Sequence, residues 1–196
     1  MAPVSQEGCL MPIRSALVAL VLLTVPSPAP ATAQQVIYLI RHAHRTDEPL
    51  SAVGLAQAAT LASLLKDSGI TAIYTSDIDR TKQTAEPLRA LLVARGVAVK
   101  MHEIPLGALG ESVENARNVA LQDAYAKKVL DDVKANHPGE VILIVGHDNT
   151  VPAVIRALKA PQTVTIQPME FDRLFQLIPR GNGQPPGFLH IQHYAN

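Results

Sequence analysis

Arginine and histidine side chains follow three of the predicted buried strands, at the point where each strand ends. The first strand is followed by residues 41–45 (Arg-His-Ala-His-Arg), the second by Thr75 and Ser76 with Arg80 close behind, and the fourth by residues 146–150 (Gly-His-Asp-Asn-Thr). Ligands of open α/β sheets bind outside the carboxyl ends of the strands, so we expect these side chains to converge. Clustered cationic groups repel one another unless an anion is present, and the forked donors of arginine match the oxygens of a phosphate dianion. The sequence therefore predicts a phosphate site.

A histidine in such a site could do chemistry on the phosphate. Phosphate monoesters hydrolyse extremely slowly unaided, and a neutral imidazole such as that of His42 can divide the reaction into two easier steps through a phosphohistidine. The arginines and a second histidine would neutralise the equatorial oxygens during the transfer. The leaving alkoxide also needs a proton, and general acid catalysis contributes about 10²–10⁴-fold.

Alternating apolar and amphipathic segments predict the elements that position these residues. The continuous apolar runs 36–40, 70–74 and 141–145 are typical of strands buried on both faces. The other predicted strands are 97–101, 171–178 and 188–194, and the predicted helices are 55–65, 76–96, 115–136 and 149–160. A capping-box pattern at 76–79 marks the start of the second helix, which we expect Pro87 to kink or divide. Strands that alternate with helices predict a three-layer α/β/α fold with a mainly parallel central sheet.

Composition excludes several classes of protein. The chain has 196 residues, and its 17 Lys and Arg balance its 17 Asp and Glu, so the net charge is zero. A neutral chain is not typical of a nucleic-acid-binding protein, whose affinity depends on clustered cations. Its single cysteine, Cys9, excludes an intramolecular disulfide and a cysteine-based zinc site.

The N-terminus has the pattern of an export signal. Arg14 precedes the apolar run 16–25, and a small-x-small site ends at Ala33. The run is shorter than the roughly 20 residues of a transmembrane helix. We therefore expect a signal peptide over residues 1–33, a mature domain over 34–196, and a periplasmic or secreted protein without stable membrane insertion after cleavage. An uncleaved anchor is the alternative, and translation could start at Met1 or at Met11.

Three blocks of the sequence resemble the signature of the histidine phosphatase superfamily, the phosphoglycerate mutase-like group (branch 1). The blocks are 39–43 (Leu-Ile-Arg-His-Ala), 74–85 (from Tyr-Thr-Ser to Gln-Thr-Ala) and 145–147 (Val-Gly-His), in the order the family shows. The resemblance implies that His42 is the phosphorylated nucleophile, that Arg41 and Arg80 clamp the phosphate, and that His147 is their electrostatic partner. It also implies a phosphoric monoester hydrolase that acts on a small phosphorylated substrate without metal or organic cofactor.

The proton donor is left open by departures from this pattern. Arg45, three residues after the nucleophile, and Asp148, directly after His147, look like the acid-phosphatase and phytase branch, where that Asp is the acid. The short chain and the second block look like the mutase-like branch, where a Glu after the third strand is the acid, and Glu103 fits that place. We favour Asp148 over Glu103, and a third alternative is that neither donates. Arg45 is a candidate phosphate ligand.

Two other functions compete with the phosphatase. A metal-dependent hydrolase could use His42, His44 and His147, although Arg41 and Arg45 would repel a cation. A non-catalytic phosphate-binding module would need the arginines but not His42.

Several remaining polar residues also receive predictions. The histidines at 102, 137, 190 and 193 are expected at the surface without partners. Glu170 and Asp172 are expected to orient a loop or an arginine.

Overall fold

The computed structural model describes residues 33–47, 49–181, 183–191 and 193–195. The predicted signal peptide, residues 1–33, lies outside these residues apart from Ala33. Within the described part of the chain, no helix is both long and apolar enough to cross a membrane.

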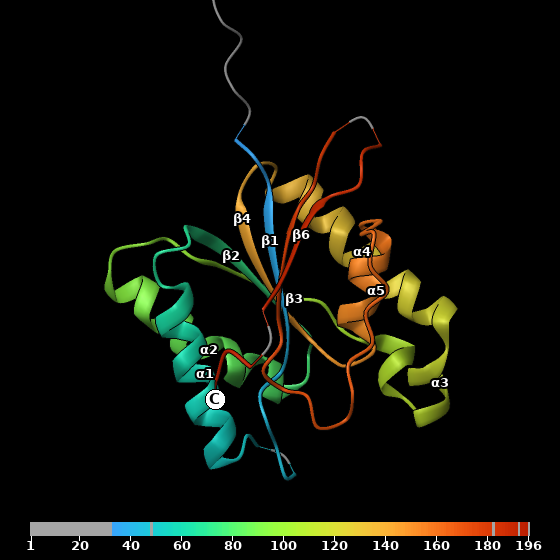
Figure 1. Ribbon diagram of the computed structural model, residues 1–196. Coiled ribbons are helices and arrows are strands. Elements are labelled where there is room, and N and C mark those ends of the chain that lie inside the picture. Colours follow the sequence, from blue (N-terminus) through green and yellow to red (C-terminus); the bar gives the residue numbers. More distant parts are fainter. Residues whose placement is uncertain (1–32, 48, 182, 192, 196) are drawn as a thin grey trace, which may run out of the picture. The chain divides into compact units, whose positions relative to one another are not determined.

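A six-stranded sheet runs through the middle of the protein (Figure 1), in the order β3-β2-β4-β1-β5-β6. The strands are β1 (Val36–Arg41), β2 (Ile70–Thr75), β3 (Lys100–Glu103), β4 (Val141–Gly146), β5 (Leu174–Ile178) and β6 (Gly187–Ile191). The four strands β1 to β4 are parallel, whereas β5 and β6 are antiparallel to their neighbours.

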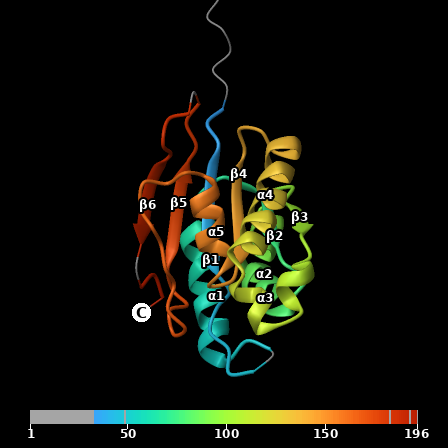
Figure 2. The same ribbon diagram turned by 90° about the vertical axis from the view of Figure 1, so that its right-hand side faces the viewer.

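Helices cover both faces of this sheet (Figure 2). On one face lie α1 (Ala52–Leu65) and α2 (Asp79–Ala94), and on the other lie α4 (Val119–Asn136) and α5 (Thr150–Ala157). A short 3₁₀ helix, Gly107–Gly110, and α3 (Val113–Arg117) connect β3 to α4. The arrangement confirms the predicted three-layer α/β/α fold with a mainly parallel sheet.

Alternate residues of the central strands pack into two separate hydrophobic cores, one on each face of the sheet. In β4, Ile142 and Ile144 pack with the α4 and α5 side, while Leu143 and Val145 pack with the α1 and α2 side. Side chains of a strand point alternately to opposite faces, so a strand covered on both faces must be apolar throughout. This is why the apolar runs located β1, β2 and β4 correctly.

The predicted start of the second helix is wrong, and so is the prediction that Pro87 could divide it. The residue that precedes α2 is Ile78, without a side-chain cap, and the Ser76 hydroxyl accepts from the Ile78 N–H at 3.2 Å. Pro87 lies inside α2 and does not divide it. The buried side chains Ala85 and Leu88 on either side of Pro87 keep this helix packed on the sheet, and tertiary packing supplies most of a helix's stability.

The predicted helix 115–136 is two helices. Asn118 separates α3 from α4, and its side-chain oxygen accepts from the N–H groups of Ala120 and Leu121, which starts a new helix. Other boundaries also move: the third strand is 100–103 rather than 97–101, the fifth begins at 174, the sixth ends at 191, and α5 ends at 157.

The prediction that the isolated histidines lie unpaired at the surface is wrong. His137 is fully buried, with its Nε2 at 2.7 Å from Nε2 of His102 and its Nδ1 at 2.9 Å from Oε2 of Glu140. On its other side, His102 contacts Asp132: Nδ1 of His102 lies 3.5 Å from Oδ1 of Asp132. The same oxygen accepts from the Tyr74 hydroxyl at 2.7 Å. This network joins α4 to β2 and β3.

The two C-terminal histidines have partners as well. Arg173 Nε donates to Nε2 of His190 at 2.9 Å, and Nδ1 of the exposed His193 lies 3.1 Å from Oδ2 of Asp172. Both contacts join residues far apart in sequence, which a reading of local pattern does not reveal.

Gly54 provides a test of how α1 packs on the segment that follows β1. A Cβ added at Gly54 would lie 2.0 Å from the main-chain oxygen of His44. We expect Gly54→Ala to lower the free energy of unfolding by about 1–3 kcal/mol, as overpacking against rigid backbone does. Gly181→Ala is the control, because a Cβ there meets nothing within 4 Å. Chemical denaturation measures both, and equal stability of the two variants would contradict the packing.

Candidate active site

A hollow of about 460 Å³ opens at the carboxyl ends of the parallel strands. Six of the seven predicted site residues line it: Arg41, His42, Arg45, Arg80, His147 and Asp148. Glu103 is not among the lining residues. The expected convergence of side chains from separate strand ends is therefore present in the fold.

The pairing of β1 with β4 sets the two histidines side by side. Arg41 lies opposite Gly146 in the register, and the His42 N–H donates to the Gly146 carbonyl at 2.8 Å. The rings of His42 and His147 consequently lie with their centroids 5.4 Å apart. A Cβ at Gly146 would lie 2.6 Å from Oγ1 of Thr150, which accepts from the His147 N–H at 2.9 Å, so glycine makes room for this contact.

The hydrogen bonds of His42 define which nitrogen can react. Nδ1 lies 2.9 Å from the carbonyl oxygen of Ala43, and because a carbonyl can only accept, Nδ1 carries the proton. The neutral ring therefore has its lone pair on Nε2. Burial, with a further contribution from the nearby Arg80 and Arg41, lowers the pKa of His42 to about 3. The imidazole is thus held in the form that can act as a nucleophile.

His147 is a neutral imidazole of the opposite tautomer. Its Nδ1 lies 3.3 Å from Nη2 of Arg80, which can only donate, so Nδ1 accepts. Its Nε2 then carries the proton and donates to Oγ of Ser76 at 3.0 Å. Burial and the neighbouring His42 and Arg80 keep the pKa of His147 well below its ordinary value. Ser76, which the sequence analysis interpreted as a helix cap, therefore orients a site residue.

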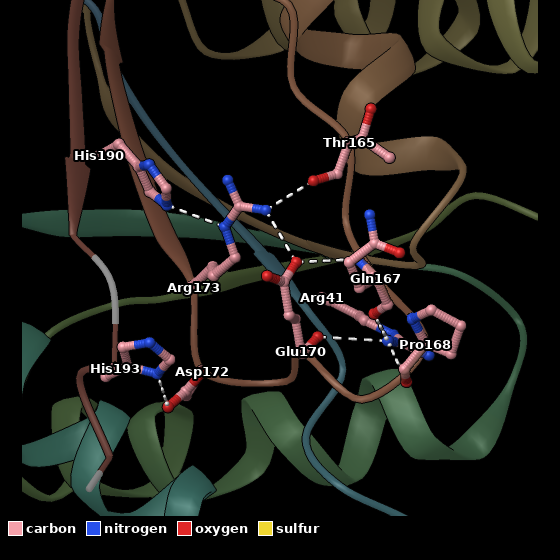
Figure 3. A network of polar contacts seen from close by, with 9 residues as sticks. All are labelled: Arg41, Thr165, Gln167, Pro168, Glu170, Asp172, Arg173, His190 and His193. Atoms are coloured by element: carbon pink, nitrogen blue, oxygen red, sulfur yellow. Dashed lines mark hydrogen bonds and ion pairs between the residues drawn. The ribbon is translucent and has the colours of Figure 1, made fainter.

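Arg41 is held by main-chain oxygens of a loop between α5 and β5 (Figure 3). Its Nη1 donates to the carbonyls of Gln167, Pro168 and Glu170 at 3.0, 2.8 and 3.2 Å. Its Nη2 lies 3.4 Å from Oδ2 of Asp148. The Nε of Arg41 is buried without a hydrogen-bond partner among the described residues. Burial lowers the pKa of Arg41.

Side-chain contacts fix the loop that holds Arg41. The Glu170 carboxylate accepts from the Gln167 N–H at 2.8 Å and from Nη1 of Arg173 at 2.9 Å, as Figure 3 shows. The adjacent Phe171 stacks under Arg41, with the guanidinium carbon 4.1 Å from the ring centroid. Glu170 thus orients both a loop and an arginine, as predicted. The sequence analysis missed the contact of Phe171 with Arg41, because an aromatic residue at this position fits the first residue of the predicted strand 171–178 equally well.

The two candidate acids have different surroundings. Asp148 lies in the lining of the hollow, and its side chain is 45% exposed. Glu103, the last residue of β3, lies with Oε2 at 2.7 Å from Nζ of Lys82. The geometry places Asp148, and not Glu103, beside the predicted phosphate ligands.

His44, the third histidine of the proposed metal set, is absent from the lining of the hollow that contains His42 and His147. Its Nδ1 lies 2.8 Å from Oγ of Ser51, the residue that caps α1. Among the described residues, His, Asp, Glu and Cys side chains form no group of three or more arranged to hold a metal ion. The predicted alternative of His42, His44 and His147 as metal ligands therefore gains no support from the geometry.

Comparison with known proteins relates this chain to one superfamily. The model of the histidine phosphatase superfamily (branch 1) matches residues 37–120. A probable phosphoglycerate mutase GpmB of Proteus mirabilis is 32% identical over 107 residues, which cover 48% of this chain and 49% of the relative. Its counterpart from Photorhabdus laumondii is 30% identical over 111 residues, again 48% of this chain and 49% of the relative. The matched region thus spans about half the length of these curated relatives.

Solved structures with the same fold include phosphatases and a mutase. YhfR of Bacillus stearothermophilus has a TM-score of 0.62 at 18% identity and covers 82% of this chain and 99% of its own. Phosphoserine phosphatase of Entamoeba histolytica, in complex with 3-phosphoglyceric acid, has a TM-score of 0.57 at 18% identity, with 82% and 99% covered. A phosphoglycerate mutase of Bacillus anthracis has a TM-score of 0.60 at 16% identity, with 82% and 93% covered. These likenesses confirm the phosphoglycerate mutase-like fold.

The protonation of His42 can be tested in the free protein. We expect its ring to remain neutral as the pH falls from about 7 to about 4, because its pKa is about 3 whereas an ordinary histidine titrates near 6.5. Inorganic phosphate should raise this pKa, since a nearby anion favours the cationic form. NMR of histidine-labelled protein measures the titration, with His42→Ala to identify the signal. A midpoint near the ordinary value without phosphate would contradict the buried, neutral ring.

Proposed function

We propose that this chain, whose residues 37–120 match the model of the histidine phosphatase superfamily (branch 1), hydrolyses small phosphomonoesters through a phosphohistidine on His42. The superfamily match and the phosphatase and mutase relatives support phosphoryl-transfer activity. The observation that carries the proposal is the neutral His42 in a hollow that it shares with three arginines.

The first step of the proposed reaction transfers the phosphoryl group to the enzyme. Nε2 of His42 attacks phosphorus, the N–P bond forms, and the bond from phosphorus to the alcohol oxygen breaks. Arg41 and Arg80 stabilise the charge on the equatorial oxygens, and Arg45, exposed at the mouth of the hollow, supplies a third cation. Asp148 donates the proton that the leaving alkoxide needs.

The second step returns the enzyme to its starting state. Water attacks the phosphohistidine, Asp148 accepts its proton, and inorganic phosphate leaves as the N–P bond breaks. Hydrolysis rather than mutase activity is proposed, because a mutase needs a pool of phosphorylated sugar acids, which lies in the cytoplasm, whereas an exported protein would act outside it.

We also propose that the protein acts outside the cytoplasm, in the periplasm or after secretion. The support is the signal-peptide pattern over residues 1–33 and a predicted mature domain free of cysteine, which suits an oxidising compartment.

Replacing the nucleophile tests the proposed function directly. His42→Ala should lower the turnover of an aryl phosphate by roughly a thousandfold or more, as loss of a covalent nucleophile does in other enzymes. Wild type, quenched during turnover of a radiolabelled substrate, should carry an acid-labile label that His42→Ala lacks. His193→Ala, outside the hollow, is the control. Full turnover by His42→Ala, or activity that EDTA abolishes in wild type, would refute the mechanism.

The identity of the acid is tested by changing the leaving group. Asp148→Asn should slow alkyl phosphates by about 10²–10⁴-fold and aryl phosphates much less, because a phenolate leaves without a donated proton. Glu103→Gln should affect both substrates equally, since Glu103 is paired with Lys82. Measurements of kcat/KM for each substrate decide the matter, because this ratio reports the first step, in which the leaving groups differ, and not the second step, which both substrates share. If Glu103→Gln, and not Asp148→Asn, slows alkyl phosphates selectively, Glu103 is the acid. If neither variant distinguishes alkyl from aryl phosphates, neither residue is the acid.

A further inference from the structure

The hollow has two walls of different chemistry. The cationic wall carries the three arginines together with His42 and His147. A second group of lining residues, here called the apolar wall, consists of Ile78, Leu106, Leu109, Val113 and Ala116, with the polar Ser112 in the same stretch of chain. Four of these five come from one stretch of chain, the segment 106–116 between β3 and α4.

We propose that this site selects phosphomonoesters whose alcohol part is uncharged and apolar, such as an aromatic ring or a branched alkyl group. This inference rests on the proposed function, because it assigns the phosphoryl group to the cationic wall. With the phosphorus at His42, the alcohol part extends toward the apolar wall, where burial of apolar surface favours binding.

The apolar wall is held in place by hydrogen bonds to the residues that follow β2 and β4. The Leu106 N–H donates to Oδ1 of Asp77 at 3.0 Å, which ties the segment to the residues that follow β2. Asn149 Nδ2 donates to the Ala116 carbonyl at 2.9 Å, which ties α3 to the residues that follow β4. Leu109 is buried in the core. A wall fixed in this way is present before a ligand arrives, so ordering it costs little binding free energy.

Exposure and charge point to the same class of ligand. Val113 is 70% exposed although it lines the hollow, so a ligand that covers it removes apolar surface from water. The exposed acidic residues Glu111 and Glu114 flank Val113 in the chain and disfavour a second negative charge on the ligand. The cations that a ligand carboxylate could reach instead are Arg45 at the mouth and Arg117, which lines an adjoining hollow of about 430 Å³.

Binding of non-hydrolysable phosphonates tests this selectivity separately from catalysis. Calorimetry on the full chain compares methylphosphonate, benzylphosphonate and 3-phosphonopropionate, with inorganic phosphate as the reference anion. Benzylphosphonate should bind roughly tenfold or more tightly than methylphosphonate, a discrimination typical of an apolar pocket. The carboxylated 3-phosphonopropionate should bind no more tightly than methylphosphonate.

A matched pair of variants locates the effect. Val113→Asn should reduce the preference for benzylphosphonate over methylphosphonate several-fold. Val119→Asn should preserve it, because Val119 is also exposed, at 57%, but does not line the hollow. Both positions are on the surface, so neither variant disturbs the core.

The outcomes separate this inference from the proposed function. If phosphate binds and benzylphosphonate has no advantage, the inference fails and the phosphate site stands. If 3-phosphonopropionate binds most tightly, and Arg45→Gln or Arg117→Gln abolishes that advantage, the ligand is acidic and the inference is overturned. If inorganic phosphate itself does not bind, the anion site and the inference built on it both fail.

Discussion

Mutual repulsion between cationic groups is the constraint on which this site depends. Three arginines and two imidazoles share one hollow, and the site must hold them there before an anion arrives. Burial keeps both imidazoles neutral, and Arg41 is compensated by three carbonyl oxygens and by Asp148. The arginines and the two neutral rings are therefore held in position by the protein itself, as a preorganised site requires.

The same constraint explains why residues distant from the hollow are polar and paired. The loop 165–170 can turn three carbonyls toward Arg41 because Glu170 and Arg173 fix its shape. Ser76 has a comparable role for His147, whose protonated nitrogen it binds. In both cases a residue that does not line the hollow, Glu170 or Ser76, fixes the orientation of one that does, Arg41 or His147. Preorganised sites require such support.

Local pattern in the sequence predicted the layers of the fold and the strand ends that meet at the site. Strands such as β4 are apolar throughout because both faces are covered. A continuous apolar run can be recognised from a few neighbouring residues, so the sequence alone predicts such a strand. The pairing of Glu103 with Lys82, and of His137 with His102, depends on which elements become neighbours in space. Ser76 shows a further difficulty, because one hydroxyl fits a helix-cap pattern and in fact orients an imidazole. Tertiary contacts therefore determine which partner such a polar side chain takes.

The position of β1 in the sheet has a consequence for the order in which the molecule can be assembled. This strand ends directly before His42, yet its partners are β4 and β5, more than 100 residues later in the chain. The carbonyls that hold Arg41 come from residues 167–170. During synthesis from the N-terminus, Arg41 therefore lacks these carbonyl partners until residues 167–170 have been made. Fragments that end before residue 167 would contain Arg41, His42, Arg80 and His147 and would still lack the carbonyls that hold Arg41.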